Sequence, residues 1–323
     1  MAGEAHPDPA VPVLYLGGLG RSGSTLLERM LGELPGVASL GEVVHLWERA
    51  LRDDERCGCG RAFSACPFWG EVGSRAFGGW DRLDAQEVVA LKYRADRTRY
   101  LPRLLLPLLR PSVRRDLLAY VELYEKVYAA AREVSGARAV VDSSKHVSLA
   151  SCLRWSRRLD LHVLHVVRDS PAVAYSWSRQ VVRPEAGPDE LMPQYSLLRV
   201  AVRWSVDNVV YDLLRMLGTA VRVVRYEDLV ADPRSTLVRI SRQADLPVQE
   251  ADLAFLSAGG GVQLQTTHTV AGNPMRFRSG TLVVRADDAW RTQMATRDRR
   301  FVAALTAPVR ARFGYGRTAR AGR

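Results

Sequence analysis

GGLGRSGST, residues 17–25, is the most informative segment of this sequence for the fold. It follows a short apolar run, VPVLYL at 11–16, and leads into TLLERMLGEL at 25–34, whose apolar residues have helical spacing. A strand, a glycine-rich turn and a helix in this order bring successive backbone N–H groups together, and the helix adds the partial positive charge of its N-terminus. The stretch therefore predicts a loop that binds a phosphate group.

Residues 18–25 have the spacing of the nucleotide-binding loop GxxxxGK[ST], but Ser24 stands where that motif has a lysine. In nucleoside triphosphatases the lysine contacts the β- and γ-phosphates, and the hydroxyl that follows it binds Mg²⁺. Here the cation of the loop is Arg21. We therefore expect the loop to bind a phosphate without serving a metal-dependent triphosphatase.

The alternation of strand and helix returns later in the chain. Apolar runs that predict strands, each followed by a segment with helical spacing, lie at 137–142, 161–167 and 220–226. Strands that alternate with helices predict an α/β protein with a P-loop-like three-layer fold, in which helices cover both faces of a mostly parallel central sheet.

The remaining segments predict less regular structure around this sheet. No convincing strand is expected between 41 and 137, so we predict a helical insertion at about 52–136 within a single domain that spans 1–323. The part from 259 onward is rich in glycine, asparagine and proline, and it predicts irregular chain that ends in a pair of helices.

The composition, 47% hydrophobic and 25% charged over 323 residues, is that of an ordinary soluble globular protein. The net charge of +11 favours anionic ligands, but the arginines are scattered and no nucleic-acid motif is present, so no nucleic-acid partner is expected. The N-terminus does not resemble a signal peptide, and the most apolar run, 101–111, is short and interrupted by Pro102, Arg103 and Pro107. We therefore expect no transmembrane segment and a cytoplasmic location.

GRSGSTLL after a strand resembles the 5′-phosphosulfate-binding loop of sulfotransferases that depend on 3′-phosphoadenosine-5′-phosphosulfate (PAPS), notably their carbohydrate and bacterial branches. The cytosolic branch has a lysine where Arg21 stands. The resemblance implies a sulfotransferase that uses PAPS as co-substrate. It also implies that the 5′-phosphate and sulfate are surrounded by Gly20, Arg21, Ser22, Gly23, Ser24 and Thr25.

The donor carries a second phosphate on its ribose, and a second basic residue follows another predicted strand. Arg168 is the first polar residue after the apolar run at 161–167, and Ser176 lies in the helix that Pro171 opens. The 3′-phosphate motif of the family has an arginine followed eight positions later by a serine. The resemblance therefore implies that Arg168 and Ser176 bind the 3′-phosphate.

Two further segments resemble this family. HTVAGNPMRFRSG at 268–280 is similar to the loop that bacterial members place over the nucleotide, which makes Arg276 and Arg278 candidates for the 3′-phosphate. VVDSSKH at 140–146 also recurs in this branch, and Lys145 lies next to a strand end, where ligands bind in open α/β sheets. We expect Lys145 either to contact the donor or acceptor, or to be a solvated lysine beside a helix-capping serine.

Transfer of a sulfuryl group requires neutralisation of the charge that grows on the leaving oxygen and removal of the acceptor's proton. Arg21 and the N–H groups of the loop suit the first task. Related carbohydrate and bacterial enzymes often use a glutamate in the region of Glu42, so Glu42 is the predicted base, with His45 and His268 as alternatives. This chemistry needs no metal, and none is expected.

Three cysteines, Cys57, Cys59 and Cys66, lie within the ten residues CGCGRAFSAC. Thiols at this density suit a zinc site, but the CxC spacing is not that of a standard zinc finger and no fourth ligand is near in the sequence. The sequence therefore favours a glycine-rich loop with buried or redox-pairing thiols.

Two other functions fit part of the pattern. In a P-loop nucleotide kinase, Asp142 at the end of a predicted strand would bind Mg²⁺, but the loop lacks the lysine. A non-catalytic nucleotide-binding protein would share both phosphate sites and lack a base. The predicted function is transfer of a sulfuryl group to a hydroxyl or amine of a small-molecule, carbohydrate or lipid acceptor, and the sequence leaves the acceptor and the oligomeric state open.

Overall fold

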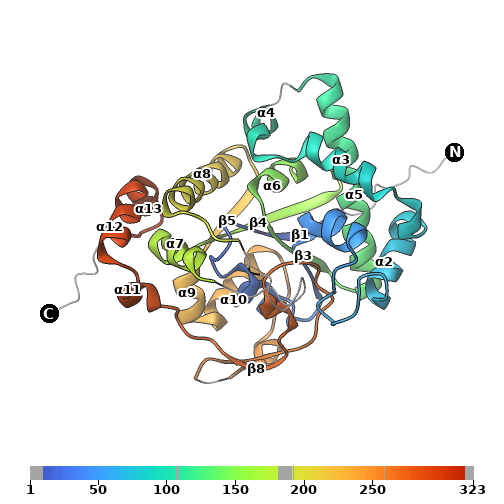
Figure 1. The fold of residues 1–323 in the computed structure, drawn as a ribbon. Helices are drawn as coiled ribbons and strands as arrows, with labels where there is room; N and C mark the ends of the chain where they lie inside the picture. Colours follow the sequence, from blue (N-terminus) through green and yellow to red (C-terminus); the bar gives the residue numbers. More distant parts are fainter. Residues whose placement is uncertain (1–9, 107–108, 181–190, 192, 258, 317–323) are drawn as a thin grey trace.

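A computed structural model describes residues 10–106, 109–180, 191, 193–257 and 259–316. Its centre is a five-stranded parallel sheet with the strand order β2-β3-β1-β4-β5 (Figure 1). The strands are β1 (Val11–Gly17), β2 (Val37–Gly41), β3 (Ala139–Lys145), β4 (Leu159–Val167) and β5 (Ala220–Arg225). Because they are parallel, their carboxyl ends meet at one edge of the sheet.

Helices surround the sheet along the described parts of the chain. Their bounds are α1 (Ser24–Leu31), α2 (Pro67–Phe77), α3 (Ala85–Ala95), α4 (Leu101–Leu105), α5 (Pro111–Ser135), α6 (Val147–Leu153), α7 (Ser170–Ser178), α8 (Leu197–Met216), α9 (Tyr226–Ala231), α10 (Pro233–Gln243), α11 (Ala289–Gln293), α12 (Thr296–Leu305) and α13 (Ala307–Arg312).

Alternate residues of the central strands point to opposite faces of the sheet, and both faces are covered. In β1, Val13 and Tyr15 pack with residues of α5, α6 and α8. Leu14 and Leu16 pack on the other side, with residues of α1 and α10. All four side chains are buried, which explains why the strands read as unbroken apolar runs. The predicted α/β class, with a mostly parallel sheet between layers of helices, is confirmed.

Two groups of helices lie at opposite ends of the sheet (Figure 1). At one end, α2 and α3 pack against the long helix α5, within the range in which the sequence predicts a helical insertion. At the other end, α11, α12 and α13 pack against α7 or α8. The carboxyl edge of the sheet lies between these two groups.

Two features of the fold differ from the prediction. The edge strand β2 was not expected, because VASLG is short and half of its side chains are small. The segment after 255 is also more regular than predicted. It forms a small antiparallel sheet of β6 (Leu256–Ser257), β7 (Gly261–Leu264) and β8 (Gly280–Val283). Three helices and not a pair then follow in the part of the chain described up to residue 316.

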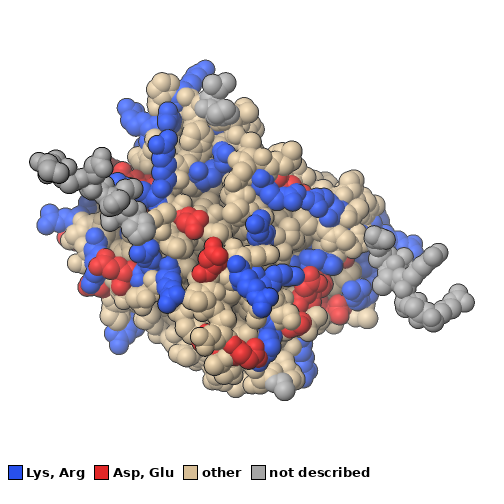
Figure 2. All heavy atoms as spheres, turned by 180° about the vertical axis from the view of Figure 1, so that it is seen from behind, with Lys and Arg blue, Asp and Glu red and all other residues tan. Residues whose placement is uncertain are grey.

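No helix in the described ranges has the length and apolar character that crossing a membrane requires. On the face shown in Figure 2, Lys and Arg side chains are spread over the surface with Asp and Glu side chains among them. This distribution agrees with the scattered arginines of the sequence.

Candidate active site

A cavity of about 1550 Å³ opens at the carboxyl edge of the sheet. All five strand ends contribute to its wall: the loop after β1, the residue after β2, the end of β3, the residue after β4 and the residue after β5. The residues at these positions are Glu42, Lys145, Arg168, Tyr226 and, in the loop after β1, Gly18 to Arg21 and Gly23 to Thr25. Ser22 of the loop is buried and does not line the cavity. The topology of a parallel sheet therefore brings together segments that are far apart in the sequence.

The loop after β1 is held tightly against Tyr226. Gly23 precedes the first residue of α1 and has a φ of 90°, in the left-handed region that favours glycine. A Cβ atom at this position would lie 2.4 Å from a ring carbon of Tyr226, so no side chain fits. No side chain of a described residue caps the N-terminus of α1. The first N–H groups of this helix, at Ser24 and Thr25 on the cavity wall, therefore suit an anion.

Arg21 extends from the same loop over the cavity. Its guanidinium lies 5.3 Å from the ring centre of Trp177, and the indole N–H of Trp177 donates to the Gly20 carbonyl at 2.9 Å. Burial lowers the pKa of Arg21, and the charge of the Glu42 carboxylate acts in the opposite direction. The loop is thus supported by α7 on the side that faces the cavity.

Arg168 connects the loop to a second part of the cavity wall. Its guanidinium donates to the Arg21 carbonyl at 3.3 Å and to the Asp287 carbonyl at 2.8 Å, and it forms an ion pair with the Asp287 carboxylate at 3.2 Å. It also stacks over the Tyr226 ring at 4.4 Å. Ser176 on α7 lines the same cavity. The structure therefore brings the predicted pair, Arg168 and Ser176, next to the predicted phosphate loop.

The two arginines predicted from the 268–280 segment lie elsewhere. Arg276 is buried and donates to the Thr269 carbonyl at 3.0 Å, and the side chain of Arg278 is exposed. Neither residue lines the cavity, whereas Gly272, Asn273 and Met275 of the same segment do. Binding of the 3′-phosphate by these two arginines stays a prediction.

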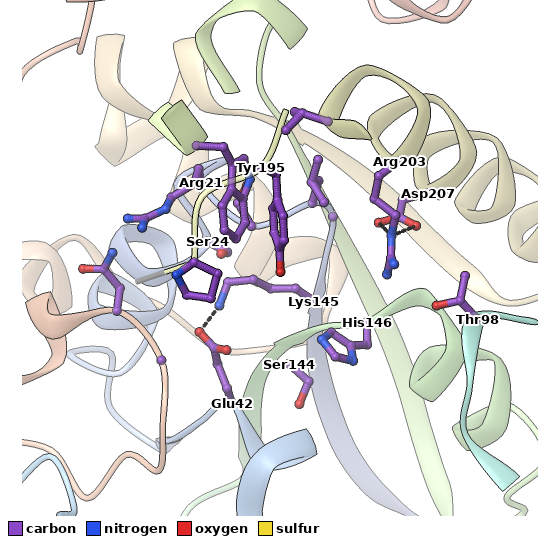
Figure 3. A pocket seen from close by; sticks show the side chains of 18 of the residues that line it. Arg21, Ser24, Glu42, Thr98, Ser144, Lys145, His146, Tyr195, Arg203 and Asp207 are labelled. Atoms are coloured by element: carbon purple, nitrogen blue, oxygen red, sulfur yellow. Dashed lines mark hydrogen bonds and ion pairs between the residues drawn. The ribbon is translucent and has the colours of Figure 1, made fainter. Parts of the chain in front are cut away.

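Glu42 and Lys145 form an ion pair inside the cavity (Figure 3). Glu42 follows β2, and its backbone N–H donates to the Val270 carbonyl at 2.8 Å. Its carboxylate accepts a hydrogen bond from the Lys145 ammonium, and the His45 ring nitrogen lies 3.7 Å from the other oxygen. A Cβ atom on Gly272 would lie 2.8 Å from the Glu42 carboxylate, so the 270–272 segment also confines this side chain.

Lys145 has a backbone conformation that is unusual for a residue with a side chain. Its φ is 67°, in the left-handed region. The Tyr211 hydroxyl donates to its carbonyl at 2.8 Å, and its own ammonium donates to the Ser143 carbonyl at 3.1 Å. Strained backbone conformations persist where surrounding contacts fix them, often at functional sites. Here the contacts turn the ammonium toward Glu42.

His268, the third candidate base, lies outside the cavity. Its ring nitrogen Nδ1 is 3.3 Å from the Cys66 sulfur and 4.0 Å from the Cys57 sulfur. Of the three candidate bases in the sequence, the cavity wall holds Glu42 and His45.

Asp142, the candidate Mg²⁺ ligand of a kinase, also does not line the cavity. It is fully buried and accepts hydrogen bonds from the Tyr128 hydroxyl at 2.5 Å and from the Ser144 N–H at 2.7 Å. Burial raises the pKa of Asp142 to about 6. Its carboxyl group serves the packing of α5 against the sheet.

Several charged and aromatic lining residues were missed by the sequence reasoning. They are Lys92, His146, Tyr195, Arg203 and Asp207. Their order in the sequence carries no motif, because they come from α3, the residue after β3, the segment before α8 and α8 itself, and they meet only in the folded chain. Burial, with the nearby charge of His45 second, lowers the pKa of His146 to about 3, so this imidazole is neutral at physiological pH.

One wall of the cavity is apolar. Leu198, Val202 and Val206 follow each other at intervals of four residues on α8, and all three line the cavity. They are 54%, 54% and 41% exposed, although the opposite side of the helix is packed in the core. This wall could have been recognised in the sequence, because the segment that forms α8 has two apolar faces, of which the core needs only one.

Comparisons with known proteins find similarity in the fold and not in the sequence. No family model matches the sequence, and no curated protein matches it. The sulfotransferase domain from the Synechococcus PCC 7002 olefin synthase superposes with a TM-score of 0.51 and 24% sequence identity, covering 94% of this chain and 97% of that chain. The sulfotransferase domain from the curacin biosynthetic pathway has a TM-score of 0.49 and 16% identity, covering 96% and 99%. This chain therefore shares the P-loop-like α/β fold of the olefin synthase sulfotransferase domain.

Proposed function

We propose that this protein is a sulfotransferase that moves a sulfuryl group from PAPS to a hydroxyl or amine of a small-molecule, carbohydrate or lipid acceptor. One observation carries the proposal. Arg168, the predicted 3′-phosphate ligand, donates to the carbonyl of Arg21 in the predicted phosphosulfate loop, and the Glu42–Lys145 pair lies in the same cavity. Two cationic sites beside a carboxylate suit a donor with two phosphate positions and an acceptor that must lose a proton. The fold of a sulfotransferase domain supports this reading.

In the proposed complex, the loop from Gly20 to Thr25 binds the 5′-phosphosulfate with its N–H groups and with Arg21. Arg168 and Ser176 bind the 3′-phosphate. The Asp287 carboxylate, which pairs with Arg168 in the structure, must then give up this contact or share it. The donor is thus held at both ends by groups that are already in place.

The reaction breaks the bond between sulfur and the oxygen that bridges it to the 5′-phosphate, and it forms a bond between sulfur and the acceptor oxygen or nitrogen. The electron pair of the broken bond stays on the bridging oxygen. Arg21 and the loop N–H groups stabilise this negative charge. Glu42 accepts the proton of the acceptor, and Lys145 orients the carboxylate. No step in this scheme requires a metal.

The α8 wall narrows the acceptor class. Leu198, Val202 and Val206 leave apolar surface exposed to the cavity, and such surface gains free energy when a ligand covers it. We propose an acceptor with an apolar body next to its reacting group, as in a lipid or an apolar small molecule.

The alternative function, a P-loop kinase, has less support. Ser24 occupies the position of the phosphate-binding lysine, and the Asp142 carboxyl is buried among Tyr128 and Ser144 away from the cavity.

Ligand-dependent thermal unfolding tests the donor assignment. Adenosine 3′,5′-bisphosphate without added Mg²⁺ should raise the melting temperature, whereas ATP under the same conditions should need a higher concentration or have no effect. Stabilisation by Mg·ATP alone would contradict the proposal and favour the kinase.

A further inference from the structure

The cysteine cluster of the sequence gains a fourth member in the folded chain. Cys57, Cys59 and Cys66 lie in the loop before α2, and the segment before Gly272 places His268 against them. The three sulfurs and the imidazole Nδ1 all lie within 4.8 Å of one another. Cys57 and Cys66 are buried, and His268 is half-buried. Among the described residues, four groups that can bind a metal therefore face one point beneath the surface.

Four of the six distances among these atoms are close to those of a tetrahedral zinc site. With a Zn–S distance of about 2.3 Å and a Zn–N distance of about 2.0 Å, two sulfurs of a tetrahedron are about 3.8 Å apart, and a sulfur and a nitrogen are about 3.5 Å apart. The Cys57–Cys66 and Cys59–Cys66 sulfur distances are 3.7 and 3.8 Å. The distances from His268 Nδ1 to the Cys66 and Cys57 sulfurs are 3.3 and 4.0 Å.

A disulfide does not account for the arrangement. A bonded pair of sulfurs is about 2.05 Å apart, and all four cysteines of the chain are free thiols. One disulfide among three cysteines would also not explain why the third thiol and the imidazole lie in the same cluster. A metal uses all four groups.

The surrounding structure holds the ligands in position. The Gly58 N–H donates to the Thr269 carbonyl at 2.9 Å, and a Cβ atom on Gly58 would lie 2.5 Å from the Thr269 hydroxyl. The Trp69 indole donates to the His268 carbonyl at 2.7 Å, and the Phe68 ring stacks on the imidazole with 5.2 Å between ring centres. These contacts fix the backbone and the ring plane of His268, so that Nδ1 faces the sulfurs.

We infer that Cys57, Cys59, Cys66 and His268 bind one zinc ion as a structural site. Three thiolates and one imidazole in a closed tetrahedral set are characteristic of structural zinc, because all four positions belong to the protein and none is open to substrate. Binding of Zn²⁺ by three thiols and a neutral imidazole releases three protons to solvent and leaves a site with a net charge of −1. The expectation that no metal is bound is replaced by this inference.

The zinc site connects the cysteine loop to a segment that lines the cavity through Gly272, Asn273 and Met275. It ties the loop before α2 to the segment 268–276, whose Val270 carbonyl accepts the Glu42 N–H and whose Gly272 confines the Glu42 carboxylate. The metal is a positioning element for that carboxylate and takes no part in the reaction. Zinc binding itself does not depend on which reaction the cavity performs.

Metal analysis of the purified full-length protein tests the site. The protein is expressed with added zinc, and gel filtration removes loosely bound ions. Elemental mass spectrometry should then find about one zinc per chain. Cys66→Ser and His268→Ala should lose most of this zinc. Cys152→Ser is the matched control, since Cys152 is also buried but its sulfur contacts the Ala95 carbonyl in a different cluster, and it should keep the metal.

A second measurement does not depend on the folding of the variants. Removal of the metal from the wild-type protein with a chelator should lower the melting temperature, and addition of Zn²⁺, but not Mg²⁺, should restore it. Cobalt added to the metal-free protein should give the thiolate charge-transfer band of a tetrahedral site. Wild-type protein that contains no zinc and keeps its melting temperature in the chelator would overturn the inference, as would a disulfide between two of the three cysteines.

Discussion

The Lys145 ammonium donates to the Glu42 carboxylate, and this contact joins the ends of the neighbouring strands β3 and β2 inside the cavity. Both side chains are mostly buried, at 11% and 15% exposure. The contact keeps the carboxylate next to the phosphate loop. In the proposed reaction this carboxylate takes the acceptor's proton, so its replacement by an amide should affect turnover.

Glu42→Gln should slow transfer strongly and leave donor binding unchanged. The amide keeps the shape of the side chain but cannot take the acceptor's proton, and loss of a general base lowers kcat by about 10²- to 10⁴-fold. The measurement is kcat beside the Kd of adenosine 3′,5′-bisphosphate. His45→Gln serves as the comparison, because His45 is the other candidate base on the cavity wall. Full turnover in Glu42→Gln with a loss in His45→Gln would move the base to His45.

Arg168→Ala should weaken binding of adenosine 3′,5′-bisphosphate by at least about tenfold, since hydrogen bonds to charged groups contribute about 1.5–3 kcal/mol. Asp287→Asn should strengthen this binding. The substitution removes a carboxylate that pairs with Arg168 in the structure and would repel the phosphate. Calorimetric titration measures both. Arg239→Ala, which removes an exposed arginine on α10, controls for the change in net charge. Equal affinities of Arg168→Ala and Arg239→Ala would argue against Arg168 as a phosphate ligand.

Val202→Asn should raise the KM for an apolar acceptor and leave the KM for PAPS unchanged. The substitution places an amide in the middle of the apolar wall on α8, and it removes apolar contact area from the acceptor. Val209→Asn is the matched control, because Val209 is 45% exposed on the same helix but does not line the cavity. If both variants behave alike toward a series of acceptors of increasing chain length, the wall does not contact the acceptor.

His165→Phe should make the protein less sensitive to mild acid. His165 is buried between Tyr211 and Phe313, and this burial lowers its pKa to about 3. In the unfolded chain its pKa is about 6.5. Between these values the unfolded state binds more protons, so stability falls as the pH falls from 6.5 toward 3.

At pH 5 this single histidine lowers the free energy of unfolding by about 2 kcal/mol relative to pH 7. The measurement is denaturant unfolding of both proteins at the two pH values. The variant should lose about 2 kcal/mol less than the wild type between pH 7 and pH 5. Parallel losses in the two proteins would show that His165 takes up its proton as readily when folded as when unfolded.

Most of the central sheet could be predicted, because strands that are buried on both faces have sequences of consecutive apolar residues. β1, β3, β4 and β5 were found in this way. β2 was not, because VASLG contains small residues and too little apolar character. The antiparallel sheet after 255 was missed for a related reason: its strands have two to four residues, too few for a period of two to be visible.

The candidate site was predictable where a local motif carries it and not where distant segments meet. The phosphate loop and Arg168 each follow a strand, so their position at one edge of the sheet follows from the topology. The Glu42–Lys145 contact depends on β2 lying beside β3, and β2 was not predicted. His268 is 202 residues from Cys66, and no spacing rule connects them. Its place among the cysteines is a property of the folded chain alone.

Tracing labelled sulfur tests the proposed transfer of a sulfuryl group from PAPS most directly. The protein is incubated without added Mg²⁺ with PAPS that carries labelled sulfur and with a series of apolar alcohols, phenols and amines, and the products are separated. We predict that the label moves to an acceptor in step with release of adenosine 3′,5′-bisphosphate, and that Glu42→Gln abolishes the movement. Failure to bind or consume PAPS, with transfer of the γ-phosphate from Mg·ATP to an acceptor instead, would contradict the account.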